Sequence, residues 1–123
     1  MTKTLGLDIL FGNTGIGRVF KPYEAEAMTL LWSTPNKGYS SRDVFVAVNK
    51  VMTGTISRAS IINFLNGMVD ADILGYTEIT GKGGHRRIYK AKILRDDFPE
   101  WLNNKVDEAL IDVNNWLLPI VDE

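Results

Sequence analysis

The 123-residue sequence has no cysteine and a single histidine, His85. The lack of cysteine excludes disulfide bonds, thiol catalysis and thiolate metal sites, and one histidine does not make a conventional zinc site. No apolar run approaches the ~20 residues of a transmembrane helix, and the N-terminal residues lack a cationic segment followed by a long apolar stretch. We therefore expect a cytoplasmic protein without a metal or other cofactor and without a membrane segment.

The sequence also offers little from which an active site could be built. The histidine lies in a glycine-rich loop and the carboxylates concentrate near the C-terminus, so no nucleophile can be paired with a base. The segment Gly12-Asn13-Thr14-Gly15-Ile16-Gly17-Arg18 has neither the spacing of a dinucleotide-binding fingerprint nor the lysine and hydroxyl of a phosphate loop. We interpret it as a turn, and the sequence does not predict an enzyme.

Charge is unevenly distributed along a chain whose length and 45% hydrophobic content suit one globular domain. Residues 1–95 hold 13 of the 14 Lys and Arg and 7 of the 15 Asp and Glu, a balance of +6. Residues 96–123 hold the remaining 1 and 8, a balance of −7. A basic body with an acidic tail is typical of a protein whose body binds phosphates, and chance segregation is the alternative.

Two short helices are predicted after an N-terminal arm or small hairpin over residues 1–20. Pro22 suits the first position of a helix that ends at the loop of residues 33–38, and its apolar side chains recur at helical spacing: Ala27, Met28, Leu31 and Trp32. A second helix begins near Ser40-Ser41, either of which can cap it. Its apolar stripe is Val44, Val48 and Val51 or Met52.

A third helix and a β-hairpin follow. The helix is capped by Ser57 and its last helical residue is expected at about Asp72. The chain leaves the helix near Gly75, which we expect to be the C-terminal cap. Its buried face is expected to hold Ile61, Phe64, Leu65 and Met68. Alternating side chains then predict strands over residues 76–80 and 86–91, joined by a glycine-rich basic tip.

The chain closes with a predicted helix of ~23 residues and roughly 35 Å, which is longer than a small domain needs for its own core. Asp97 and Glu100 are spaced as an N-terminal capping pair, with Pro99 in the first turn. Apolar residues recur at alternating spacings of four and three, which is typical of a helix that packs on another helix. We expect a dimer interface of Trp101, Leu102, Val106, Ala109, Leu110, Val113, Trp116, Leu117 and Ile120. The alternative is a helix folded back on its own domain.

The exposed face of the third helix can read DNA. Between Ser57 and Val69 it has no Lys or Glu, unlike an ordinary solvated face, and it offers hydroxyl, amide and guanidinium groups that pair with bases or phosphates. Ile62 is expected to belong to the core, although it could meet a thymine methyl if it faced the groove. The candidate contacts, including the start of the second helix, are Ser41, Arg42, Ser57, Arg58, Ser60, Asn63 and Asn66.

The hairpin tip combines glycines with potential cations, a composition that lets the backbone approach a phosphate strand or the minor groove. The candidate contacts are Lys82, His85, Arg86 and Arg87. Glycines that serve only as turn residues are the alternative.

Four segments of the chain resemble, in this order, a known family: Pro22-Tyr23-Glu24-Ala25-Glu26-Ala27-Met28 through Leu31-Trp32, Ser40-Ser41-Arg42-Asp43-Val44, Ile56-Ser57-Arg58-Ala59-Ser60-Ile61, and Gly81-Lys82-Gly83-Gly84 with Arg87-Ile88-Tyr89. The family is the penicillinase repressor family (BlaI/MecI/CopY type), and the likeness spans roughly residues 20–92. It implies a dimeric winged-helix repressor of inverted-repeat operators. By position, Ser57, Arg58, Ser60 and Asn63 match the recognition helix, and residues 82–87 match the wing.

The chain also departs from this family. Copper-responsive members carry a cysteine motif that is absent here, and no cleavage site of the antibiotic-responsive members can be assigned to the tail. The single long C-terminal helix is closer to that of PadR-like regulators. The controlling signal, an effector or a partner protein, is left open.

The sequence therefore predicts a mainly α fold with a small β-hairpin (α+β), in which a winged helix-turn-helix domain at residues 21–95 precedes a dimerisation helix at residues 96–123. The predicted function is that of a homodimeric, sequence-specific regulator of transcription that binds double-stranded DNA as a repressor. The alternative is a winged-helix module that binds another protein, since this fold alone does not decide function.

Overall fold

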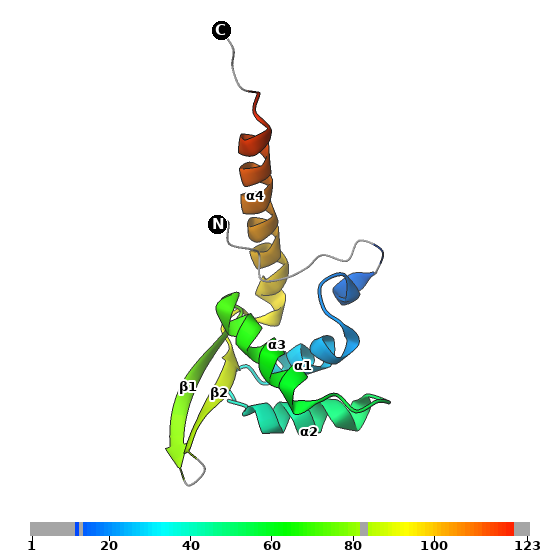
Figure 1. Cartoon of the computed structure of the whole chain (residues 1–123), viewed down its shortest axis with the longest axis vertical. Helices are drawn as coiled ribbons and strands as arrows, with labels where there is room; N and C mark the ends of the chain where they lie inside the picture. Colours follow the sequence, from blue (N-terminus) through cyan, green and yellow to red (C-terminus); the bar gives the residue numbers. More distant parts are fainter. Residues whose placement is uncertain (1–11, 13, 82–83, 120–123) are drawn as a thin grey trace.

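A computed structural model describes residues 12, 14–81 and 84–119. Three helices form a body, from which a β-hairpin and a long helix project in opposite directions (Figure 1). Along the chain the elements are η1 (Gly15–Arg18), α1 (Pro22–Ser33), α2 (Ser41–Val51), α3 (Arg58–Asp70), β1 (Leu74–Gly81), β2 (Gly84–Ala91), η2 (Arg95–Asp97) and α4 (Phe98–Leu117).

The first two helices begin where their capping residues predict. Pro22 opens α1, and the carboxylate of Glu24 accepts a hydrogen bond of 2.8 Å from the Lys21 backbone N–H. Ser40 caps α2 through a reciprocal pair of bonds with Asp43: its hydroxyl accepts from the Asp43 N–H at 3.1 Å, and the Asp43 carboxylate accepts from the Ser40 N–H at 3.0 Å. These bonds satisfy backbone donors that a helix N-terminus would otherwise leave free.

The third helix starts as predicted and ends earlier than predicted. The Ser57 hydroxyl accepts from the Ser60 N–H at 3.0 Å, which confirms it as the cap. The helix stops at Asp70, and Asp72 adopts a left-handed φ of 71°, a conformation that aspartate tolerates better than most residues. Gly75 lies in β1, so the expectation that it caps α3 is wrong.

The hairpin is longer than predicted and is attached to the α1–α2 loop. Its antiparallel register runs from Leu74 opposite Ala91 to Gly81 opposite Gly84. The backbones of Tyr39 and Tyr89 exchange two hydrogen bonds of 2.9 and 2.8 Å. A Cβ on Gly38 would lie 2.2 Å from Cγ2 of Ile88, so a glycine allows the loop to approach the strand this closely.

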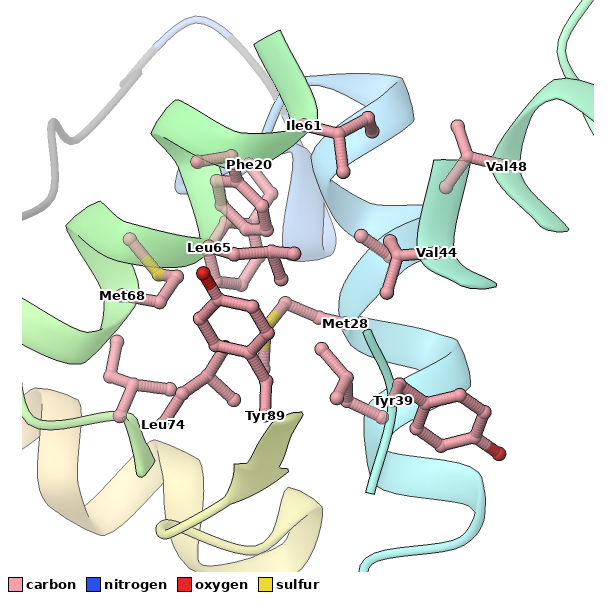
Figure 2. Close-up of a cluster of buried hydrophobic side chains, with 14 of the residues drawn as sticks. Phe20, Met28, Tyr39, Val44, Val48, Ile61, Leu65, Met68, Leu74 and Tyr89 are labelled. Carbon is pink, nitrogen blue, oxygen red and sulfur yellow. The ribbon is translucent and has the colours of Figure 1, made fainter. Parts of the chain in front are cut away.

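The core lies where the three helices meet the base of the hairpin. Figure 2 shows side chains from all of these elements converging, including Met28, Val44, Leu65 and Tyr89. The apolar face predicted for α3 is buried, as are Ala27, Met28 and Leu31 of α1 and Val44 and Val48 of α2. Trp32, also predicted on the α1 face, is half-buried and packs against the core. Val51, the possible end of the α2 stripe, is exposed, and Met52 packs against the core instead.

Aromatic rings join α4 to this body. Phe98 is buried and stacks on Phe20 at 5.8 Å and on Trp101 at 5.6 Å between ring centroids. The Trp32 indole N–H donates to the Ile93 carbonyl at 2.9 Å, just before α4. Pro99 occupies the first turn as expected, but Asp97 makes no capping bond through its side chain. The predicted capping pair is wrong because the 3-10 turn η2 leads directly into the helix.

The described part of the N-terminal segment is helical instead of extended. Residues 15–18 form η1, and Phe20 enters the core, so this part of the predicted arm or small hairpin is not a strand. The rest of the predicted arm, residues 1–11 and 13, lies outside the described residues. Among the residues that are described, no helix has the length and apolar character required to cross a membrane.

Candidate nucleic-acid interface

The turn between α2 and α3 is held by one side chain, Asn49. Its amide donates to the Ile56 carbonyl at 3.1 Å and to the Phe45 carbonyl at 3.0 Å, and its oxygen accepts from the Ile56 N–H at 2.7 Å. Asn49 thereby fixes the connector from which α3 starts. This role of Asn49 could not be found from the sequence, because an asparagine late in a helix carries no local signal of a partner seven residues away.

We predict that Asn49→Ala lowers the free energy of unfolding by about 1–3 kcal/mol, because it leaves the N–H and carbonyl of Ile56 without partners. Urea denaturation followed by circular dichroism would measure the change. The control is Asn63→Ala, which truncates an exposed asparagine on α3 and should change stability by no more than about 0.5 kcal/mol. Equal losses in the two variants would contradict the assigned role of Asn49.

Four of the predicted contact residues meet where α3 begins. The Arg58 guanidinium approaches the Ser41 hydroxyl at 3.4 Å and lies 5.9 Å from the ring centre of Phe45. The Ser57 hydroxyl donates to that of Ser60 at 3.0 Å. Arg42 is exposed on the first turn of α2. The structure therefore gathers hydroxyl and guanidinium groups of α2 and α3 around the N-terminal turn of α3.

The next turn of α3 presents an uncharged surface. Ala59 and Asn63 are exposed, and Ile62 is half-buried without being part of the hydrophobic core. The expectation that Ile62 belongs to the core is therefore wrong. Ile61 is the residue that is fully buried at this level, which turns the neighbouring Ile62 toward the edge of the exposed face.

Asn66 is held in the junction between α3 and the hairpin. Its side-chain oxygen accepts a 2.6 Å bond from the Tyr89 hydroxyl and a 3.1 Å bond from the Arg87 guanidinium. Arg87 in turn lies 3.9 Å above the ring centre of Tyr76. The Asn66 oxygen and the Arg87 guanidinium therefore join the wing to α3. The expected contact of Asn66 and Arg87 with DNA stays a prediction.

Tyr89 contributes to this junction as a buried donor. Burial raises the pKa of its hydroxyl, and the nearby Arg87 opposes that rise through its charge and a hydrogen bond. The hydroxyl therefore stays protonated at neutral pH and donates to Asn66. Figure 2 shows it pointing toward α3.

The other hairpin candidates lie nearer the tip. His85 and Arg86 are exposed opposite Thr80 and Ile79, and Lys82 falls outside the described residues. Strand alternation places Lys90, which is also exposed, on the same face as Arg86. Lys90 was not among the predicted contacts, although the period-two pattern could have identified it.

The expected dimer surface on α4 is partly buried at its root. Trp101 and Leu102 are half-buried and pack against the protein's own core, and their contact with a partner stays a prediction. Val106 and Ala109 are half-buried, and the following apolar side chains are exposed: Leu110, Ile111, Val113, Trp116 and Leu117. Ile120 lies outside the described residues. Beyond its root, α4 does not fold back on the body (Figure 1).

A helix-turn-helix formed by α2 and α3 and followed by a β-hairpin is a winged-helix arrangement, and the predicted α+β fold is confirmed. A solved structure of a possible transcriptional regulator from Methanosarcina mazei Go1 has a similar fold, with a TM-score of 0.60 over 80% of this chain and 77% of that chain. The two sequences are 11% identical, so the likeness concerns the fold alone. No protein-family model matches the sequence, and no curated protein matches it.

Proposed function

We propose that the protein is a transcriptional regulator that binds double-stranded DNA through α3 and the hairpin. The observation that carries this proposal is the junction at Asn66, which holds a cationic hairpin beside the uncharged exposed face of α3. A helix with such a face fits the major groove, and exposed cations on the adjacent hairpin reach the phosphates. The +6 balance of residues 1–95 supports an anionic ligand. The proposed role is regulatory and not enzymatic, and its place is the cytoplasm.

The finer part of the proposal is a homodimeric repressor of the penicillinase repressor type. Two copies joined along the exposed apolar side chains of α4 would present two α3 helices to an inverted repeat. Beyond its root α4 projects away from the hairpin, so the helix that holds Asp107, Glu108 and Asp112 would lie away from the DNA (Figure 1). A dimer bound to such an operator would then block the promoter.

Fluorescence anisotropy with the purified full chain tests DNA binding. The duplexes are the DNA upstream of its own gene and an unrelated sequence of equal length, each measured from low to physiological salt. We expect salt-sensitive binding that is tighter for the upstream duplex. No binding to either duplex at low salt would reject the proposal in favour of a protein-binding winged helix.

The wing contact can be tested at Arg86. We expect Arg86→Ala to weaken binding to every duplex and to reduce the slope of log K against log salt by about 0.9, the change for one phosphate contact. Lys105→Ala is the matched control, because it removes the same charge from α4 and should leave the slope unchanged. If the slope of Arg86→Ala equalled that of the wild type, the hairpin would not contact phosphate through this residue.

A further inference from the structure

The exposed face of α3 presents a small group of uncharged side chains. Phosphate binding by the nearby cations does not give these side chains a role. Ala59, Ile62 and Asn63 are neighbours at helical spacing, the first and third exposed and the second half-buried outside the core. The group ends one turn later at Asn66, whose oxygen is bonded to the hairpin. A DNA duplex seated against α3 would meet two apolar side chains and one free amide here.

The nearby arginine side chains are held by other residues and do not cover this group. Arg58 is directed along α2 by Ser41 and Phe45, and Arg87 is placed on Tyr76 and Asn66. No Lys or Glu lies on α3 between Ser57 and Val69. The usual reader of guanine is an arginine or lysine aimed at the O6 and N7 atoms, and neither residue is part of this group.

The chemistry of these three side chains matches the edge of an A·T pair in the major groove. An asparagine amide pairs with the N6 and N7 atoms of adenine, and apolar side chains contact the C5-methyl group of thymine. Resting on the proposed DNA binding, we propose that Asn63 reads an adenine while Ile62 and Ala59 contact thymine methyl groups, so that each half-site contains adjacent A·T pairs.

Site selection from a randomised duplex library, with the full-length protein, gives the first test. We expect the enriched half-sites to contain consecutive A·T pairs. Each thymine in the selected site is then replaced by deoxyuridine, which removes the methyl group and leaves the base pairing intact. At contacted positions we expect each replacement to lower affinity about three- to five-fold, the loss of roughly one buried methyl group.

Protein variants assign the methyl contact to Ile62. Ile62→Ala should bind the thymine duplex more weakly and lose its sensitivity to deoxyuridine at one position. Ile16→Ala on η1 makes the same change at an exposed site outside α3, the hairpin and α4 and should keep that sensitivity. Circular dichroism would confirm that both variants are folded.

The outcomes separate this inference from the proposed function. Tight, salt-sensitive binding to a selected site of G·C pairs, or an A·T site with no response to deoxyuridine, would overturn the inference and leave DNA binding intact. Absence of binding to any duplex at low salt would overturn both. The deoxyuridine measurement uses the wild-type protein, so it does not depend on the folding of a variant.

Discussion

Replacing Val113 and Trp116 together by aspartate is expected to convert the proposed dimer into a monomer. We also expect the change to lower affinity for an inverted-repeat operator by at least about 100-fold, because two linked binding modules gain that much or more over one. Both side chains are exposed on α4, with 49% of Val113 and 82% of Trp116 accessible. A buried interface formed by these residues would not accommodate four added carboxylates, two from each copy.

Light scattering would measure the oligomeric state, and anisotropy would measure affinity for duplexes with one or two half-sites. The variant should bind the single half-site as the wild type does. The control replaces the neighbouring Asn114 and Asn115 by aspartate, which adds the same charge at exposed polar positions of the same helix. A wild-type protein that is monomeric at micromolar concentration would show that α4 does not form the proposed interface.

Phe20→Ala is expected to lower the free energy of unfolding by about 3–5 kcal/mol, the usual range for a buried phenylalanine. Phe20 is 1% exposed, and its ring lies 5.8 Å from those of Phe64 and Phe98 and 6.3 Å from that of Trp32. Its removal would leave a cavity where α1, α3 and α4 meet. The variant should therefore lose the packing of α4 on the body as well as global stability.

Urea denaturation would measure the loss, and tryptophan emission would report on Trp32 and Trp101 beside the cavity. The matched control is Ile16→Ala on η1, four residues away and 45% exposed, which should cost less than about 1 kcal/mol. A loss for Phe20→Ala as small as that of the control would show that the ring is not part of the core in solution.

The parts of the fold that follow from local chemistry could be predicted from the sequence. Ser40 and Ser57 cap helices through backbone groups three residues away, and Pro22 fits a first helical position, so each signal lies within one turn. The end of α3 could not be located this way. Asp72, and not a glycine, takes the left-handed conformation there, and Gly75, the glycine expected to cap the helix, lies in β1.

The candidate site was predicted in outline but not in its internal arrangement. The order of elements was enough to predict a basic hairpin beside α3. The engagement of Asn66 by Tyr89, 23 residues away, depends on how the hairpin packs on the helix, and no sequence spacing encodes it. The same holds for Ile62, whose placement depends on a helix rotation set by its neighbours Ile61 and Leu65 in the core.

The hairpin is fastened at two points, to α3 through Asn66 and to the α1–α2 loop through Tyr39. Both attachments involve Tyr89 near the base of the hairpin, so together they restrain how this base can move relative to α3. Neighbouring base pairs are ~3.4 Å apart along DNA. A duplex bound by both elements would therefore have to keep a set spacing between the two positions that they contact. Inserting one base pair between these positions would separate the contacts, and the restrained hairpin base could not move to restore them.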